Sequence, residues 1–202
     1  MQVSVRPLAI FTLIAMLPIT AAVETLAATP QQNVSLCQDG NARPAAAITA
    51  CTALLQADNG TAAFGDVFYN RGSAYLNNKQ YDRAVQDFDV AIKRKPDFAV
   101  AFINRGFAHE KTQQYDEALK DYDQALKLDS KSVFSLVHRG DAYAKKEQYQ
   151  RAIQDYDSAI ALAPKSASAL HGRGLAKIQI GDKAGGEADI AKATALNITG
   201  GK

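Results

Sequence analysis

The feature that most constrains this chain is a spacing of 34 residues that recurs along most of its 202 residues. Four kinds of residue keep this spacing in four successive places. They are Arg71, Arg105, Arg139 and Arg173, the glycines that follow them at Gly72, Gly106, Gly140 and Gly174, then Asp87, Asp121, Asp155 and Asp189, and Ala91, Ala125, Ala159 and Ala193. Such a repeat indicates equal units that stack on one another, because a unit this short cannot bury its apolar face alone.

The apolar residues within a unit indicate two consecutive helices. In the second half of the first unit they stand at i, i+1, i+4, i+7 and i+8, one face of an α-helix, at Ala84, Val85, Phe88, Ala91 and Ile92. The first half of the unit has the same period. Asn77-Asn78 marks a turn between the two helices, and Pro96 and Pro164 mark breaks between units. The sequence therefore predicts an all-α chain of antiparallel helix pairs.

A helix–turn–helix unit of this length with these columns resembles the tetratricopeptide repeat (TPR). Counted from Gly65, the signature positions 4, 8, 11, 20, 24, 27 and 32 of that family fall on Phe68, Gly72, Tyr75, Ala84, Phe88, Ala91 and Pro96. The resemblance implies a right-handed superhelical solenoid with three full units, at 65–98, 99–132 and 133–166, and a degenerate fourth unit at 167–198 that acts as a cap.

The fourth unit departs from the family pattern in its second half. Gly185 and Gly186 each cost about 1 kcal/mol relative to alanine inside a helix. We therefore expect the last helix to be shorter or more mobile than its equivalents, and residues 199–202 to form a disordered tail.

The first residues have a different character. Arg6 precedes an apolar run from Leu8 to Ile19, and small residues follow it, which is the order of a secretory signal peptide. The run is shorter than the roughly 20 residues that span a bilayer. We expect residues 1–27 to be a cleaved signal, with an uncleaved anchor as the alternative. Export predicts a periplasmic or secreted protein, and the chain is similar to small exported repeat proteins of proteobacteria.

Export changes the interpretation of Cys37 and Cys51, the only two cysteines. In an oxidising compartment an even pair suggests a disulfide, and closing a loop of this size is worth roughly 3 kcal/mol. Two free thiols or half of a metal site are the alternatives. Residues 47–51 match residues 84–88, which places Cys51 at the buried aromatic position. We expect residues 28–64 to form a partial repeat, or cap, whose two halves the disulfide joins.

The arginine and aspartate columns are the most regular polar feature. An antiparallel helix pair brings position 7 of a unit opposite position 23 of the same unit. The first helix of the next unit also runs antiparallel to that second helix, so its position 7 lies opposite position 23 as well. Each arginine is therefore predicted to meet an aspartate, within a unit or between units. Charged groups in a packed interface are normally paired. This favours an ion-pair ladder that fixes the stacking register over a row of guanidinium groups that bind anions.

The resemblance also implies a binding surface, because in TPR proteins the first helices line a concave face. The positions that usually meet a ligand are occupied here by Tyr69, Asn70, Ser73, Val100, Ile103, Asn104, Phe107, Phe134, Val137, His138, Asp141 and His171. For Ile103 and Val137, packing between neighbouring helices is an equal alternative. The mixed, partly apolar wall suits an extended or helical peptide. The lysines and arginine with which some TPR domains clamp a C-terminal carboxylate are missing.

Other classes of function find little support. The formal net charge is only +2, and basic residues alternate with acidic ones, unlike the basic stripe of a nucleic-acid binder. No nucleotide or catalytic motif is complete, and we predict no cofactor or bound metal; a metal or proton-transfer site at His138, His171 and Asp141 is the competing hypothesis. We predict a non-catalytic scaffold, monomeric or weakly homo-oligomeric, that binds a protein or peptide. The alternative is a structural envelope component that self-assembles.

Overall fold

The structure is a computed structural model that describes residues 28–40, 43–57 and 65–199. The predicted signal peptide lies outside these residues, as do the end of the predicted cap and residues 200–202. Within the described residues there are ten helices and no strand. They are α1 (Pro30–Gln38), α2 (Pro44–Ala57), α3 (Gly65–Asn77), α4 (Tyr81–Arg94), α5 (Ala99–Lys111), α6 (Tyr115–Leu128), α7 (Val133–Lys145), α8 (Tyr149–Leu162), α9 (Ala167–Gln179) and α10 (Lys183–Thr199).

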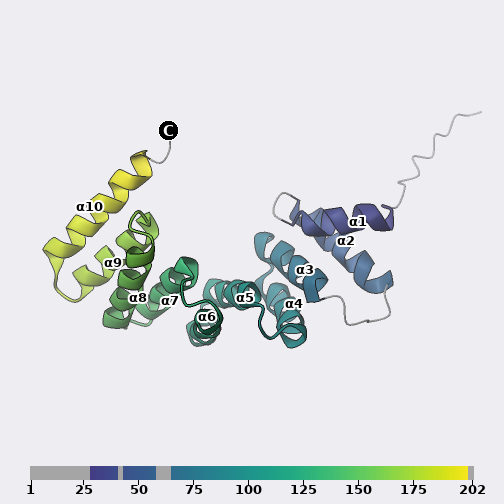
Figure 1. The fold of residues 1–202 in the computed structure, drawn as a ribbon, viewed down its shortest axis with the longest axis horizontal. Coiled ribbons are helices and arrows are strands. Elements are labelled where there is room, and N and C mark those ends of the chain that lie inside the picture. The colour runs from purple at the N-terminus through teal and green to yellow at the C-terminus, as the bar shows by residue number, and fades with distance from the viewer. Residues whose placement is uncertain (1–27, 41–42, 58–64, 200–202) are drawn as a thin grey trace, which may run out of the picture.

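The helices form antiparallel pairs that follow one another along an arc (Figure 1). Each helix packs on the one before and the one after it, and consecutive first helices, such as α7 and α9, also touch. In Figure 1, α3 and α5 lie toward the inner side of the arc, and α4 and α6 lie along its outer side. The predicted all-α solenoid is confirmed, and the helix pairs from α3 onward coincide with the units expected from the sequence.

The turn inside each pair has one recurring backbone feature. Lys79, Gln113, Glu147 and Gly181 occupy the same place in the four units and all have positive φ, between 58° and 93°. The residue that follows donates its N–H back to the helix, as Gln80 does to the carbonyl of Tyr75 at 2.8 Å. This is the usual way in which a left-handed residue ends a helix. Three of the four units use a side-chain-bearing residue where glycine is the least strained choice.

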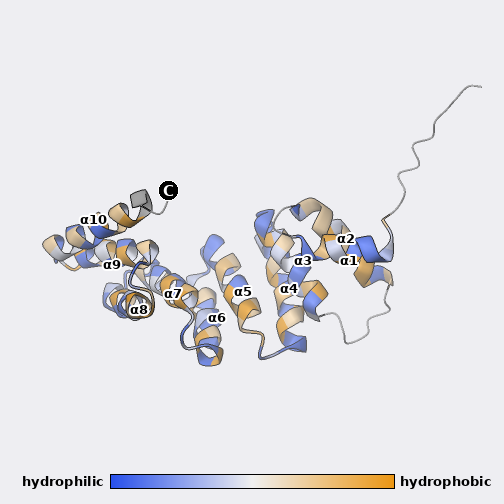
Figure 2. Cartoon of the chain, turned by 45° about the horizontal axis from the view of Figure 1, so that its top comes forward, coloured by the Kyte–Doolittle hydropathy of each residue, from blue (hydrophilic) through white to orange (hydrophobic). Residues whose placement is uncertain are grey.

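The core between the two helices of a unit consists of a glycine facing a large ring. A Cβ atom added at Gly72 would lie 2.8 Å from Cε1 of Phe88, and one at Gly140 would lie 2.8 Å from Cε1 of Tyr156. Phe88 and Tyr156 are almost completely buried, as are the alanines at repeat positions 20 and 27. The small columns therefore let the two backbones approach, and the rings fill the space between them. Figure 2 shows the resulting alternation of apolar and polar faces along the helices.

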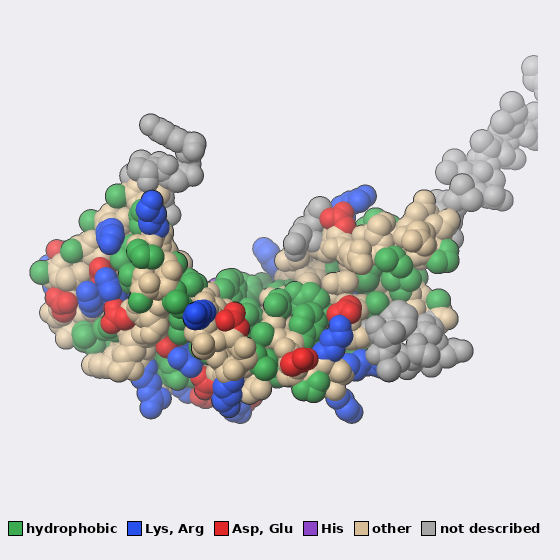
Figure 3. Space-filling view, in the orientation of Figure 1, with side chains coloured by type: hydrophobic (Ala, Val, Ile, Leu, Met, Phe, Trp, Pro, Cys, Tyr) green, Lys and Arg blue, Asp and Glu red, His purple; other side chains and the backbone are tan. Residues whose placement is uncertain are grey.

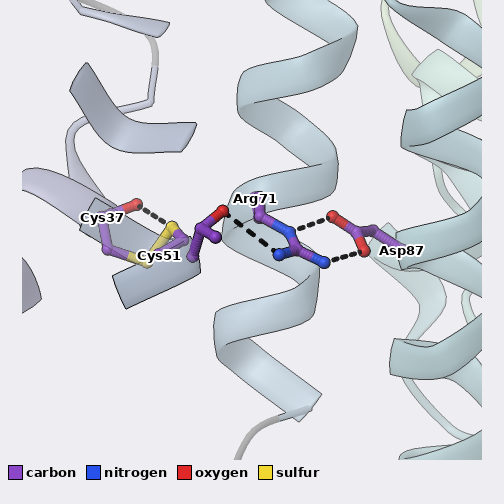
Figure 4. Close-up of a disulfide and its surroundings, with 5 residues drawn as sticks. Cys37, Cys51, Arg71 and Asp87 are labelled. Atoms are coloured by element: carbon purple, nitrogen blue, oxygen red, sulfur yellow. Dashed lines mark hydrogen bonds and ion pairs between the residues drawn. A yellow bond between two sulfur atoms is a disulfide. The ribbon is translucent and has the colours of Figure 1, made fainter. Parts of the chain in front are cut away.

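The cap is a helix pair closed by the expected disulfide, between Cys37 in α1 and Cys51 in α2 (Figure 4). Both cysteines are buried. Cys51 takes the place that the large rings take in the full units. Its neighbour Thr52 accepts a hydrogen bond from Nη1 of Arg71 at 3.2 Å, which joins the cap to α3. The disulfide thus stands where a full unit has its aromatic core.

The last helix differs from the sequence-based expectation. α10 contains 17 residues, whereas α4, α6 and α8 each contain 14. Gly185 and Gly186 lie at the start of this helix, where the first N–H groups lack partners within the helix in any case, and the N–H of Gly186 makes its first regular bond, to the carbonyl of Asp182 at 3.0 Å. The side chain of Asp182 accepts the N–H of Gly185 at 3.0 Å and so caps the helix. The prediction of a shorter helix was wrong, and so was the placement of Thr199 in the tail, because α10 includes it.

Gly186 also has a packing role. A Cβ atom at Gly186 would lie 2.5 Å from the carbonyl oxygen of Gly174 in α9, and one at Gly174 would lie 2.7 Å from the carbonyl oxygen of Gly186. In the fourth unit, glycine faces glycine across the pair. The two backbones therefore approach directly, and no ring lies between them.

Removing the disulfide tests the role of the cap. We expect the Cys37→Ser, Cys51→Ser variant to lose roughly 3 kcal/mol of unfolding free energy, because the disulfide closes a loop of 14 residues in the unfolded chain. Urea unfolding followed by circular dichroism measures the loss. Reductant should lower the stability of the wild type and leave the variant unchanged. Equal stability of the wild type and the variant in the absence of reductant would contradict the prediction.

A second substitution tests the glycine contact of the last pair. Alanine normally stabilises an exposed helix position relative to glycine by about 1 kcal/mol. We expect Gly174→Ala to destabilise the protein instead, by roughly 1–3 kcal/mol, because its methyl group meets backbone atoms that cannot turn away. Thermal unfolding gives the sign, and a raised melting temperature would show that α9 and α10 separate without cost.

Candidate functional site

The candidate site is the inner face of the arc, which the first helices supply. Figure 3 shows this face as a hollow, with hydrophobic side chains over its floor. Phe134, near the start of α7, is 49% exposed, and Val100, near the start of α5, is 45% exposed. Large apolar side chains rarely remain this open without a partner when they cluster. We call this surface the groove.

Three rings form the centre of the groove. Phe134 packs against His138 with ring centroids 4.1 Å apart, and Phe107 packs edge-on against His138 at 5.3 Å. Phe107 and Phe134 are 6.5 Å apart. The structure therefore brings together one aromatic residue of α5 and two ring-bearing residues of α7 that the sequence assigned to the binding surface.

The imidazole of His138 lies beside the carboxylate of Glu110, a residue that was not predicted as part of the site. Its Nδ1 lies 3.1 Å from Oε2 of Glu110, and the hydroxyl of Tyr122 donates to the same oxygen at 3.1 Å. Burial alone would raise the pKa of Glu110, but the hydrogen bond and charge of His138 outweigh it, so that this pKa lies below its ordinary value. Glu110 stands at position 12 of its unit, a ligand-facing position of the family, so position alone could have identified it.

The C-terminal part of the groove contains a cavity of about 410 Å³ between α7 and α9. Its lining includes Asp141 and Glu110, the ring of Tyr156, and Gly172 and Leu175 of α9. The hydroxyl of Tyr156 donates to Oδ1 of Asp141 at 2.6 Å. Burial raises the pKa of Asp141 above its ordinary value despite this hydrogen bond. His171, also assigned to the groove, is exposed and lines the same cavity.

The N-terminal part of the groove contains a second, more polar cavity of about 310 Å³. Residues of the cap, including Cys37 and Gly40, form one wall, and Tyr69, Asn70 and Ser73 of α3 form another. The side-chain amide of Asn104 donates to the hydroxyl of Tyr69 at 3.2 Å, which links α5 to α3. Four of the predicted groove residues thus gather here, and the cap completes their surroundings.

Val137 does not line the groove as expected, and Ile103 does so only in part. Val137 is 6% exposed and belongs to the apolar core that α7 shares with α8 and α9. Of its two alternatives, packing is therefore correct. Ile103 is half-buried and keeps part of its surface in the groove.

The arginine column pairs in two directions at once. Nε and Nη2 of Arg139 donate to the two carboxylate oxygens of Asp155 in its own unit, at 2.8 and 2.6 Å, and Nη1 donates to Asp123 of the preceding unit at 2.7 Å. The same within-unit fork joins Arg71 to Asp87, Arg105 to Asp121 and Arg173 to Asp189. The between-unit bond recurs from Arg105 to Asp89 and from Arg173 to Asp157.

The second aspartate column, at Asp89, Asp123 and Asp157, was missed in the sequence although it has the same spacing. Thr52 of the cap takes the corresponding place before it, and Ala191 of α10 takes the corresponding place after it. Each arginine is thus held within its unit by a bidentate pair and fixed to its neighbour by a third bond. We call this arrangement the ladder.

Two further findings concern metal binding and membrane crossing. In the described residues no group of three or more His, Cys, Asp or Glu side chains is placed to hold a metal ion. Over the same residues, no helix combines the length and the apolar character that a membrane crossing requires.

The family comparisons agree with the repeat. The tetratricopeptide-repeat family model matches residues 65–98 and 99–132, and a related TPR-repeat model matches residues 140–181. Together the matches span more than half of the chain. No curated protein matches its sequence.

Several solved structures share the fold. MamA from Desulfovibrio magneticus RS-1 is 20% identical, with a TM-score of 0.75 over 84% of this chain and 96% of that chain. Another crystal structure of MamA is 18% identical, with a TM-score of 0.72 over 81% and 96% of the two chains. The Arabidopsis OM64 TPR domain is 26% identical, with a TM-score of 0.57 over 59% and 98%. At this identity the likeness to MamA shows the fold alone.

The ladder predicts unequal costs for its two aspartate columns. We expect Arg139→Ala to lower the free energy of unfolding by roughly 3 kcal/mol, because it leaves the buried carboxylate of Asp155 without its partner. Asp123→Asn should cost less than about 1 kcal/mol, because that side chain is 47% exposed. Chemical unfolding of both variants measures the difference, and equal costs would contradict the assigned roles.

Proposed function

The chain belongs to the tetratricopeptide-repeat family, and from this membership we propose that it is an exported scaffold whose groove binds a segment of a partner protein. The family matches and the fold shared with the OM64 TPR domain indicate a protein-interaction scaffold. The binding surface, the kind of ligand and the compartment are the parts that we add.

The observation that carries the proposal is the aromatic centre of the groove, in which Phe134 is exposed and Phe107 is half-buried. Phe107 and Phe134 come from neighbouring first helices, and each is fixed by contact with His138. Aromatic side chains that are accessible on rigid helices lose little conformational freedom on binding, so they make good anchors for a partner. A cavity lies toward each end of the groove from this centre, which suits a segment that crosses several units.

The buried disulfide supports the proposed export. Structural disulfides persist in oxidising compartments and are rare in reducing ones. Cys37 and Cys51 are both in the bond, so the cap depends on oxidation for its covalent closure. Together with the signal-like first 27 residues, this favours a periplasmic or secreted location. Secretion of the chain with and without that segment, assayed by fractionation, tests the localisation.

A binding experiment with matched variants tests the groove. We expect Phe107→Ala, Phe134→Ala to weaken capture of partners from envelope extract by about tenfold or more, because truncating an aromatic anchor costs around 2 kcal/mol. The control is Leu128→Ala, Leu162→Ala, which removes side chains that are 40% and 45% exposed on the second helices α6 and α8.

The control variant should capture partners as the wild type does, and circular dichroism should show all three proteins folded. If the phenylalanine variant binds as well as the wild type, the groove assignment is wrong. If the leucine variant loses binding instead, partners dock on the second helices.

A further inference from the structure

One groove position shows how this surface holds a nitrogen-bearing side chain. The imidazole of His138 stacks on the ring of Tyr122, with centroids 6.0 Å apart and planes 27° apart. Its Nδ1 lies 3.1 Å from the carboxylate of Glu110, to which the hydroxyl of Tyr122 also donates. The place beside this tyrosine is therefore filled by a planar nitrogen base that both stacks and binds a carboxylate.

One unit later the same place has no side chain of its own. The residue 34 positions after His138 is Gly172, and the residue 34 positions after Tyr122 is Tyr156. A Cβ atom at Gly172 would lie 2.6 Å from Cζ and 2.9 Å from the hydroxyl oxygen of Tyr156. The bare backbone of Gly172 thus lies against this ring, and both residues line the 410 Å³ cavity between α7 and α9.

A carboxylate is available in this cavity, as it is in the His138 site. Asp141 lines it, and Oδ1 of Asp141 accepts the hydroxyl of Tyr156 at 2.6 Å, which fixes the carboxylate beside the ring. The nearest basic nitrogen to Oδ2 in the described residues is Nδ1 of His138, at 3.9 Å, beyond hydrogen-bond distance. Glu110 adds a second acidic group to the lining, and Lys145 adds the one lysine.

The other walls are apolar. Ala144 and Ala176 line the cavity, and Leu175 is 47% exposed at its edge. An aliphatic stem can lie on this surface while its charged end reaches the carboxylates. The partial burial that raises the pKa of Asp141, whose side chain is 38% exposed, also means that a cation here would bind a carboxylate with less competing water than on an open surface.

We propose that the cavity between α7 and α9 binds an arginine side chain of the partner segment, next to the tyrosine and carboxylate that correspond to those beside His138 one unit earlier. This inference rests on the proposed function, because it names the chemistry of the segment that the groove holds. Arginine fits better than lysine, because a planar guanidinium can donate two parallel hydrogen bonds to the carboxylate of Asp141 at the edge of the buried ring of Tyr156. The ammonium group of lysine cannot form this planar, bidentate pair.

Small probes test the chemistry without knowledge of the partner. Nitrogen-15 NMR titrations of the protein with N-acetyl-arginine amide, the lysine analogue and the neutral citrulline analogue report binding at the amides of Asp141, Gly172 and Leu175. We expect arginine to bind about tenfold more tightly than citrulline, because the charge-assisted hydrogen bonds are lost, and more tightly than lysine. Equal binding of arginine and citrulline, or tighter binding of lysine, would overturn the proposal.

Variants locate the site. Asp141→Asn keeps the shape of the side chain and should weaken binding of the arginine probe by about tenfold, whereas Asp97→Asn, which removes an exposed carboxylate in the α4–α5 connection, should not. Unchanged binding to Asp141→Asn would exclude this cavity. Self-association of the protein that Asp141→Asn abolishes would make the occupant an arginine of a second copy, and would overturn the partner assignment.

The same variants separate this inference from the function it rests on. If Phe107→Ala, Phe134→Ala loses its partners while Asp141→Asn keeps them and the arginine probe does not bind, the groove function stands and the arginine inference fails. If the phenylalanine variant keeps its partners, the groove function fails even though the cavity binds the probe.

Discussion

The bidentate pair between an arginine of each first helix and an aspartate of each second helix is the interaction on which the rest of the structure depends. In each unit it fixes the two helices at one register, and the third bond of the ladder fixes that unit to the one before. Buried ion pairs add little net stability compared with apolar packing, but they penalise every arrangement that leaves them unpaired. Because the ladder sets the stacking, it also sets which side chains of α5, α7 and α9 meet in the groove.

The repeated residues were the predictable part of the molecule. Gly72 and Phe88 recur with equivalents in later units, and a residue type that recurs at one spacing must serve the packing that all units share. The arginine–aspartate encounter followed from the geometry of an antiparallel pair. The second aspartate column, at Asp89 and its equivalents, was equally regular, and it was missed only because the first column already satisfied the expected pairing.

The parts that could not be predicted are those in which one unit departs from the others. Glu110 has no acidic equivalent in the neighbouring units, and Gly172 matters because its equivalents carry side chains. Such a departure can leave a cavity, or neighbouring side chains can fill the space. The positions of the surrounding rings decide between the two, and the repeat period does not predict those positions. Val137 and the last helix show the same limit, since a half-buried position and a glycine pair are decided by the partner across the interface.

The ends of the ladder determine where the molecule could change in length. Thr52 supplies a neutral acceptor at the start, and Ala191 supplies none at the end. A copy of residues 133–166 inserted before α9 would find Asp157 behind it and would present its own aspartate to Arg173. The same copy appended after α10 would place its arginine against Ala191, without a carboxylate. Duplication in evolution, or in engineering, therefore continues the ladder unbroken when a unit is added from within, whereas a unit added after α10 lacks the between-unit carboxylate at its first joint.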